Sequence, residues 1–435
     1  MTELRPYQTE IVDKILMIPK VGVFADMGLG KSACTIKALQ ILMYPRTLII
    51  APKLVAMSTW PQEFLRWDSA ARVTLIAGTP KKRAEKVLSV SDVFIISRDN
   101  VEWLVKTFKN IHYDVIVLDE SSSFKNFTAK RTRAVKQLCK TADRVIELTG
   151  TPASNGYGDL FSQIFLLDGG QRLGKSVTRF REEYMSGPVI NGHKIYNKMK
   201  KGSEEKINEL IKDITFSLKS CDYLQLPDRV DSFIKLSLDD STRRDYERLK
   251  NDYVLRHGNE VITVANAAVM CGKLACLANG FIYNDDKEVI EFSRHKLERL
   301  KEIIDVSTEN ILVFAVYQRD ITEIEKLGAV KLDSSSKIEM WQRGEIKVGV
   351  AQPASLAYGV NLQSGGRTVI WYSCPYSLEQ YQQANKRLHR SGVKGTVSII
   401  HMITEDTIDI DIYKSLQNKT LTQDSLLNMC KLHMT

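Results

Sequence analysis

The sequence lacks an apolar run long enough to cross a membrane, and residues 1–6 have none of the features of a secretory signal. It has only seven cysteines in 435 residues, an odd number without the paired spacing of a disulfide framework. We therefore expect no membrane span and a reducing compartment such as the cytoplasm. Cys271 and Cys276 have no second cysteine or histidine pair nearby, so we expect core packing there and no zinc site.

No short repeat or low-complexity tract is visible. Hydrophobic residues make up 43% of the chain and charged residues 26%, as in an ordinary soluble globular protein. The length favours two or three domains. The net charge of +9 suggests a polyanionic partner, although charge alone would suit a membrane surface or an acidic protein equally well.

Apolar runs alternate with helix-like stretches in the first and last thirds of the chain. Runs that are apolar at consecutive positions favour strands buried on both faces of a parallel sheet. We therefore predict an α/β chain of two lobes, 1–225 with a helical protrusion from about 166, and 226–435 with a helical insertion at about 232–290. The strand candidates are residues 21–24, 47–51, 93–96, 115–118, 145–148, 311–315, 347–351, 368–371 and 397–400.

Residues 25–32 form a glycine-rich stretch between an apolar run and the helix-patterned residues 33–42. Gly28 and Gly30 let the backbone curl so that its N–H groups point at phosphate oxygens. Lys31 can neutralise the outer phosphates, and the Ser32 hydroxyl can bind Mg²⁺. Although alanine stands where the first glycine is usual, this setting predicts a nucleoside triphosphate site.

A second stretch, residues 169–176, matches the G-x-x-x-x-G-K-S pattern more closely than the first, with Lys175 as its lysine. However, no strand-like run precedes it, and a charged and aromatic stretch follows it. We interpret this stretch as a loop that opens a helical segment, because a phosphate-binding loop needs a strand before it.

Two acidic residues end the apolar run at 115–118. Parallel-sheet proteins bind their ligands at the carboxyl ends of strands, which is where Asp119 and Glu120 would lie. We expect Asp119 to approach Mg²⁺ through water and Glu120 to polarise the attacking water.

A basic cluster follows near the end of the chain. Gln383, Arg387 and Arg390 are spaced at i, i+4 and i+7, so they would share one face of a helix. Planar guanidinium groups can pair with two phosphate oxygens. Taken alone, this cluster is equally consistent with a solvated helix face.

The order of these motifs resembles that of the superfamily two helicases, and most closely the Swi/Snf-like DNA translocases in their compact phage and bacterial form. Residues 148–155 are close to the family signature Leu-Thr-Gly-Thr-Pro-x-x-Asn, the most specific of the matches. The chain departs from the family where Ser122 replaces a histidine and where Leu356 and Ala357 replace paired glycines. The matching segments are residues 4–8, 26–32, 51–67, 119–122, 148–155, 313–317, 357–362 and 383–390.

The resemblance implies two RecA-like lobes, with ATP and Mg²⁺ as cofactors and double-stranded DNA as partner. It assigns catalysis to Glu120, Arg387 and Arg390, and the metal to Ser32 and Asp119. It also implies nucleotide contacts, coupling residues and DNA contacts, with Gln8 as the reader of the purine. The nucleotide contacts are Gln8, Met27, Gly28, Leu29, Gly30, Lys31, Ser32 and Gly359; the coupling residues are Thr149, Gly150, Thr151 and Gln383; the DNA contacts are Lys53, Ser97 and Asn361.

From the resemblance we predict a DNA-stimulated ATPase that moves along double-stranded DNA. We expect a monomer in the cytoplasm of a bacterial host, working with phage or bacterial proteins of replication, recombination or repair. Two alternatives stay open: a helicase that separates strands at forks, and a clamp whose grip on DNA is gated by ATP.

Overall fold

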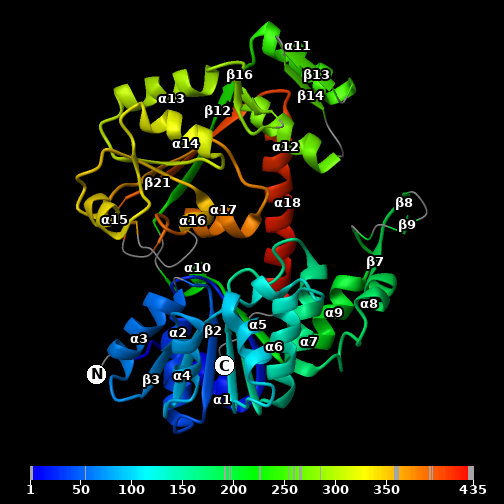
Figure 1. The fold of residues 1–435 in the computed structure, drawn as a ribbon, viewed down its shortest axis with the longest axis vertical. Helices are drawn as coiled ribbons and strands as arrows, with labels where there is room; N and C mark the ends of the chain where they lie inside the picture. The colour runs from blue at the N-terminus through cyan, green and yellow to red at the C-terminus, as the bar shows by residue number, and fades with distance from the viewer. Residues whose placement is uncertain are drawn as a thin grey trace. The chain divides into compact units, whose positions relative to one another are not determined.

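The computed structural model describes residues 3–53, 55–190, 193–194, 196, 198–224, 227–252, 254–257, 260–263, 267–284, 286–356, 362–390, 393 and 395–429. The chain divides into two compact units, one made of Met1–Leu224 with Lys419–Thr435 and the other of Gln225–Asn418. Each unit is built on a parallel sheet with helices packed against it (Figure 1). The predicted α/β class with two parallel sheets is confirmed.

The first unit contains a seven-stranded sheet in the order β11-β1-β6-β5-β2-β4-β3. All of its strand pairs are parallel. The carboxyl ends of its strands therefore meet at one edge. The strands are β1 Lys20–Ala25, β2 Thr47–Ala51, β3 Val73–Ile76, β4 Val93–Ser97, β5 Val115–Asp119, β6 Arg144–Thr149 and β11 Thr215–Leu218.

Alternate residues of these strands enter two different cores, one on each face of the sheet. Ile49 and Val117 pack with the helices α1 Pro6–Met17, α2 Lys31–Ile41 and α3 Trp60–Trp67. Ile50 and Leu118 pack on the other face. The helices that contribute to that second core are α4 Pro80–Val87, α5 Val101–Thr107, α6 Lys130–Thr141, α7 Leu160–Asp168, α8 Val177–Tyr184 and α9 Ser203–Ile211.

The protrusion expected from residue 166 is less helical than the sequence suggests. After α7 and α8 the chain forms two short antiparallel pairs. It then passes through α9 and returns to the sheet as its edge strand β11. The remaining short elements of this unit are β7 Met185–Ser186, β8 Val189–Ile190, β9 His193–Lys194, β10 Lys198–Met199, α10 Ser220–Tyr223 and the turns Val55–Thr59, Arg98–Asn100, Ser121–Phe124 and Tyr157–Asp159.

The second unit contains a six-stranded parallel sheet in the order β12-β21-β20-β17-β19-β18. Val313 and Ile370 face the helices α13 His295–Val306 and α14 Gln318–Glu325, whereas Leu312 and Trp371 face α15 Ser335–Gln342, α17 Leu378–Asn385 and α18 Ile408–Met429. The strands are β12 Arg229–Leu236, β17 Ile311–Phe314, β18 Val330–Lys331, β19 Val348–Ala351, β20 Thr368–Trp371 and β21 Val397–Thr404, and a short helix, α16, spans Pro353–Leu356.

The insertion expected at 232–290 begins later than predicted. Residues up to Leu236 belong to β12, which pairs with β21 over eight residues and so forms the edge of the main sheet. The insertion itself has its own small core, to which Tyr246, Leu274 and Phe281 contribute. It consists of α11 Asp240–Asp252, β13 Val254–His257, β14 Glu260–Thr263, α12 Ala267–Ala278, β15 Phe281–Tyr283 and β16 Val289–Glu291.

The last helix, α18, is divided between the two units. Up to Asn418 it belongs to the second unit, and from Lys419 onward to the first, so the second unit does not extend through 435 as the sequence suggests. Burial and the nearby charge of Lys125 lower the pKa of Lys419, while Asp159 opposes that shift. Among the described residues, no helix is both long and apolar enough to qualify as a membrane span.

Candidate functional site

The residues predicted to form the site in the first unit follow the carboxyl ends of neighbouring strands. The nucleotide loop follows β1, the Thr149-Gly150-Thr151 segment ends β6, and Asp119 ends β5. Lys53 follows β2 and Ser97 ends β4. Since these strands are adjacent in the order β1-β6-β5-β2-β4, the sheet brings all five segments to one edge.

The loop after β1 has the backbone shape that its glycines allow. Gly28 and Gly30 have φ angles of 87° and 82°, which residues with a side chain rarely adopt. A Cβ at Gly30 would collide with the amide nitrogen of Gln8. That amide donates a hydrogen bond to the carbonyl of Leu29 at 3.1 Å, so Gln8 lies directly against the loop.

Gln8 also has a structural role in α1. Its Oε1 accepts a hydrogen bond from the backbone N–H of Arg5 at 2.9 Å, which caps the start of the helix. Both ends of the Gln8 amide are therefore engaged with the protein.

Lys31 begins α2 and folds back over the loop. Its Nζ donates hydrogen bonds to the carbonyl oxygens of Ala25 at 2.6 Å and Asp26 at 3.2 Å. The next residue, Ser32, lies in the first turn of the same helix, where backbone N–H groups and the helix dipole favour an anion. This loop fits a phosphate group.

Asp119 is a buried carboxylate held at the end of β5. Its Oδ2 accepts from the indole nitrogen of Trp60 at 2.8 Å, and its Oδ1 accepts from the backbone N–H of Glu120 at 3.1 Å. Burial raises the pKa of Asp119, while Trp60, Lys31 and the Glu120 N–H act in the opposite direction. With the Ser32 hydroxyl, this carboxylate offers the oxygen ligands that Mg²⁺ prefers.

Glu120 adopts a left-handed backbone conformation, with φ of 52° and ψ of 57°. This conformation is uncommon for a residue with a side chain and is enriched at functional sites, although Met43, Tyr44, Lys287 and Asp406 also adopt a positive φ in this chain. It ends the strand abruptly and turns the chain into Ser121–Phe124.

A chain of buried hydrogen bonds joins the acidic segment to the segment after β6. The Ser121 hydroxyl donates to Oε1 of Gln163 at 3.1 Å, and Nε2 of Gln163 donates to the carbonyl oxygens of Pro152 at 2.7 Å and Asp159 at 3.0 Å. The sequence analysis missed Gln163. A polar residue within the apolar helix Leu160–Asp168 was the available signal.

The residues after β6 that were predicted to couple ATP to DNA pack against the start of the predicted nucleotide loop. The Thr149 hydroxyl accepts a hydrogen bond from the Thr151 N–H at 3.0 Å. A Cβ at Gly150 would lie 3.3 Å from the carbonyl oxygen of Ala25, so this segment and the loop are in close contact.

The two DNA-contact candidates of this unit lie at the carboxyl ends of paired strands. Ala51 of β2 is in register with Ser97 of β4. Lys53 is exposed, whereas Ser97 is buried and its hydroxyl accepts a hydrogen bond from Asn100 at 3.0 Å.

In the second unit, the predicted shared helix face is wrong. The helix α17 ends at Asn385, so only Gln383 lies on it, and Arg387 and Arg390 follow in turns. The helix stops where the Asn385 side chain accepts a hydrogen bond from the indole of Trp371 at 2.9 Å. Arg387 is buried, with 2% of its surface exposed, while Arg390 is half-buried. The predicted Gly359 and Asn361 lie outside the described residues.

The second G-K-S stretch has the setting that the sequence analysis predicts. It follows the helix α7 and opens the helix α8. The Ser176 hydroxyl accepts a hydrogen bond from the Arg179 N–H at 3.4 Å, so this serine caps its own helix.

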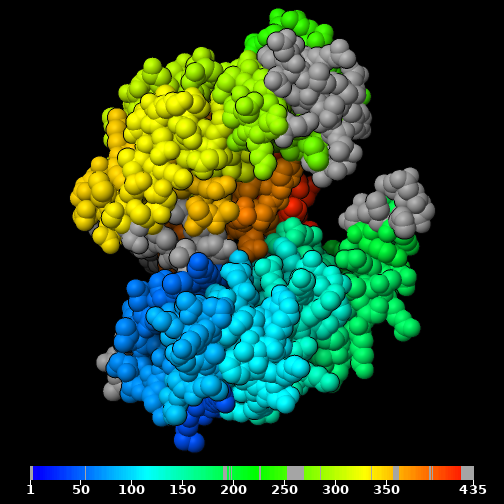
Figure 2. Space-filling model, viewed as in Figure 1, coloured from blue at the N-terminus to red at the C-terminus, as the bar shows by residue number. Residues whose placement is uncertain are grey.

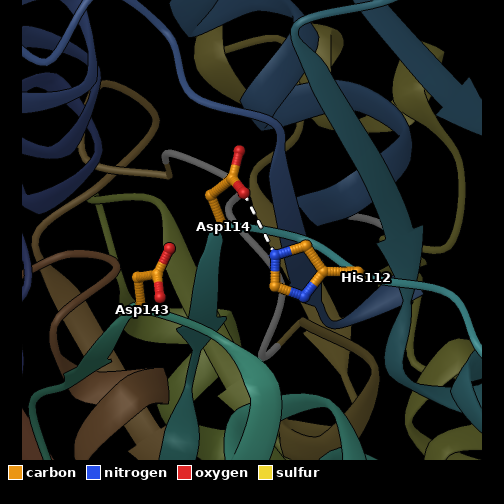
Figure 3. A group of neighbouring side chains, drawn as sticks. All are labelled: His112, Asp114 and Asp143. Atoms are coloured by element: carbon orange, nitrogen blue, oxygen red, sulfur yellow. Dashed lines mark hydrogen bonds and ion pairs between the residues drawn. The ribbon is translucent and has the colours of Figure 1, made fainter.

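A separate group of possible metal ligands lies at the opposite edge of the first sheet. Among the described residues, His112, Asp114 and Asp143 place one ligand atom each within 4.8 Å of one another (Figure 3). Figure 3 shows His112 turned towards Asp114, and their hydrogen bond of 3.1 Å accounts for that proximity. These residues precede β5 and β6, so they are not part of the site beside Lys31.

Comparison with known proteins gives consistent matches over this chain. The model of the SNF2-related domain matches residues 16–279. The protein named putative protein p41, from Acyrthosiphon pisum secondary endosymbiont phage 1, is 31% identical and the match covers 98% of both chains. A Caenorhabditis elegans homolog of SWI/SNF-related matrix-associated actin-dependent regulator of chromatin subfamily A-like protein 1 is 24% identical over 99% of this chain and 64% of its own length.

A solved structure, the Sulfolobus solfataricus SWI2/SNF2 ATPase core in complex with dsDNA, is 20% identical, with a TM-score of 0.47 over 100% of this chain and 98% of that one. The family model covers more than half of the chain, and the phage relative matches nearly all of it. The chain therefore belongs to the SNF2-related family of ATPases.

Proposed function

We propose that this protein is an ATP-driven motor that moves along double-stranded DNA in phage or bacterial replication, recombination or repair. The observation that carries the proposal is the carboxyl edge of the first sheet. The nucleotide loop follows β1, the coupling candidates lie at the end of β6 and the metal and catalytic candidates at the end of β5, and the DNA candidates lie at the ends of the adjacent β2 and β4. In such an arrangement the ATP and DNA contacts would share one rigid sheet, so that a structural change at the ATP contacts would alter the DNA contacts.

The loop after β1 would hold the triphosphate. Phosphate oxygens are stronger acceptors for Lys31 than the two neutral carbonyl oxygens that it now contacts. Ser32 and Asp119 would hold Mg²⁺, which would neutralise phosphate charge during transfer. Glu120 would orient and polarise the attacking water, since its side chain follows directly after the metal-binding carboxylate. Gln8, already against the loop, would contact the purine.

The second unit would complete the chemistry with Arg387 and Arg390, whose guanidinium groups would stabilise the charge on the transferred phosphoryl group. Gly359 would contact the nucleotide, and Gln383 would take part in coupling. Thr149, Gly150 and Thr151 lie against the nucleotide loop, which supports a coupling role for them.

DNA would be held mainly through its phosphates, by Lys53, Ser97 and Asn361. Contacts of this kind give little sequence preference and an affinity that falls steeply with salt. We expect a monomer to be sufficient for movement.

A triplex-displacement assay beside a forked-duplex unwinding assay tests the proposal. A duplex motor should displace the third strand in an ATP-dependent way and separate forks poorly. Efficient unwinding without triplex displacement would identify a strand-separating helicase instead. DNA retention by ATP without either activity would identify a clamp, an outcome for which the replacement of the family histidine by Ser122 is a specific reason.

A further inference from the structure

A pocket with a volume of about 680 Å³ lies in the first unit between α6 and α7. Lys20, the first residue of β1, lines it, so it opens near the amino edge of the sheet, opposite the edge that carries Lys31. The exposed side of α6 forms part of the surface that Figure 2 shows in cyan. None of the residues assigned above to ATP or DNA lines this pocket.

Positive charge surrounds the pocket. Lys20, Arg133, Lys136 and Lys140 all line it. Lys20 donates a hydrogen bond to the carbonyl oxygen of Cys139 at 3.2 Å. Within the described part of the chain, no acidic side chain pairs with Arg133, Lys136 or Lys140.

The one carboxylate of the lining does not compensate these charges. Asp168 accepts hydrogen bonds from the backbone N–H groups of Gly170 at 2.7 Å and Arg172 at 2.9 Å. It also forms an ion pair with the Arg172 guanidinium at 3.4 Å. The Asp168 carboxylate therefore binds groups of the turn that follows α7 and does not pair with the cations of α6.

The spacing of the cations on α6 is unfavourable for the helix itself. Arg133 and Lys136 are at i and i+3, and Lys136 and Lys140 are at i and i+4, so like charges face one another on one side of the helix. Burial lowers the pKa of Lys136, and the neighbouring charge of Arg133 lowers it further. Only Lys140 is near enough to the end of α6 to be favoured by its dipole. An anionic ligand would relieve the repulsion.

The α7 side of the pocket is apolar. Phe165, Leu166 and Leu167 line it, and of these the Phe165 side chain is half-buried while the two leucines are buried in the core. The ammonium group of Lys136 lies 3.5 Å from the ring centre of Phe127 and 4.6 Å from that of Phe165, so cation–π contacts hold it beside the aromatic ring that lines the pocket. The lining thus combines the cations of α6 with the half-buried ring of Phe165.

We propose that this pocket binds an acidic peptide segment of a partner protein, with an apolar side chain on Phe165 and carboxylates against Arg133, Lys136 and Lys140. A DNA backbone would use the cations but would place no apolar group in a concave pocket. An acidic peptide with one large apolar residue satisfies both parts of the lining. This proposal is independent of the motor function.

Fluorescence polarisation with the full chain tests whether this pocket binds an acidic peptide. The probe is a short labelled peptide of Asp and Glu with Phe at its centre, compared with the same peptide carrying Ala in place of Phe and with a single-stranded oligonucleotide. We expect saturable, salt-sensitive binding of the Phe peptide and weaker binding of the Ala peptide. Arg133→Glu and Lys140→Glu should each weaken binding at least about tenfold.

Lys130→Glu is the matched control, because Lys130 is an exposed cation on the same helix that does not line the pocket. Thermal unfolding of each variant shows whether the fold is retained. The proposal is overturned by absence of saturable binding to the folded wild-type chain, by equal binding of the Ala peptide, or by an equal loss in Lys130→Glu. Binding of the oligonucleotide alone, lost in Arg133→Glu, would identify a nucleic-acid contact instead.

Discussion

The two G-K-S loops of the first unit share the four residues Leu-Gly-Lys-Ser and a backbone angle, but they differ in the elements around them. Gly30 and Gly174 have φ angles of 82° and 83°, and each loop leads into a helix. In the first loop the helix begins at Lys31, so Ser32 lies inside its first turn. In the second the helix begins at Val177, and the Ser176 hydroxyl caps it.

The place of each loop in the fold distinguishes the two loops better than their match to the G-x-x-x-x-G-K-S pattern does. The first loop lies at the carboxyl edge of a parallel sheet, with the buried Asp119 close enough to Lys31 for their charges to interact. The second follows α7 and has no strand behind it. A phosphate loop is therefore defined by the edge on which it sits and by the groups that face it.

The largest expected effect is the difference in ATP turnover between variants that lack the lysine of one loop or of the other. Lys31→Ala should reduce ATP turnover to the background of the assay, because it removes the cation that faces the outer phosphates. Lys175→Ala should leave turnover unchanged. Steady-state ATPase measurements with saturating DNA compare the two variants. Normal turnover in Lys31→Ala together with loss in Lys175→Ala would reverse the assignment of the loops.

Glu120→Gln tests whether ATP is hydrolysed beside the first loop, because only that loop is proposed to share its site with a catalytic acid. The amide cannot polarise water, so hydrolysis should fall by about 10²–10⁴-fold while ATP still binds. Glu182→Gln, an exposed position on the helix after the second loop, is the control. Single-turnover hydrolysis and nucleotide binding are measured separately. Hydrolysis near the wild-type rate in Glu120→Gln would make this residue structural.

The hydrogen-bond chain through Gln163 connects the acidic segment to the segment that packs on the first loop. Gln163→Leu removes the whole chain and Ser121→Ala removes its first bond. We expect ATP hydrolysis without DNA to persist, and stimulation by DNA to fall roughly threefold to thirtyfold. The readout is the ratio of the rates with and without DNA.

Ser162→Ala is the matched control for that chain. Ser162 is a buried serine beside Gln163, but its hydroxyl donates to the carbonyl oxygen of Phe124 at 2.6 Å. Its loss should therefore not change the ratio. An equal fall in all three variants would mean that packing of α7, rather than this chain of bonds, supports stimulation.

The smallest expected effect is on nucleotide affinity. Gly30→Ala and Gly174→Ala both place a side chain at a positive φ, which costs roughly 1–2 kcal/mol in stability. At Gly30 the new Cβ also meets the flexible end of Gln8, whereas at Gly174 nothing lies within 4 Å. Both variants should lose stability, Gly30→Ala more because it also displaces the hydrogen-bonded Gln8 amide, and only Gly30→Ala should bind ATP several-fold more weakly. Identical affinities would show that Gln8 does not shape the loop.

The strands that the sequence analysis predicted and those that it missed differ in their place in the sheet. The predicted runs, such as Ile49-Ile50 and Val117-Leu118, are inner strands whose both faces are buried, so consecutive apolar residues mark them. The missed strands β3, β11, β12 and β18 are the edge strands of the two sheets. In β12 most residues are exposed, and Arg229 and Asp231 pair with each other on it. An edge strand carries no continuous apolar run for a sequence pattern to detect.

The candidate site, like the strands, was only partly predictable from the sequence. Asp119 and Lys31 stand where an apolar strand gives way to polar residues, and the parallel order of the strands brings them together. The partnership of Ser121 with Gln163 was not predictable, because 42 positions separate the two residues and only the packing of α7 joins them. The contact of Asn385 with the indole of Trp371, a residue of β20, was likewise not readable from the sequence.

The division of α18 makes the second unit an insert within a discontinuous first unit. Gln225–Asn418 is bounded on both sides by residues that belong with the first sheet. If the molecule were stretched between α1 and the segment after Lys419, tension would pass through the first unit alone. In that geometry Gln225–Asn418 would carry load only after the segment from Lys419 had separated from the rest of the first unit.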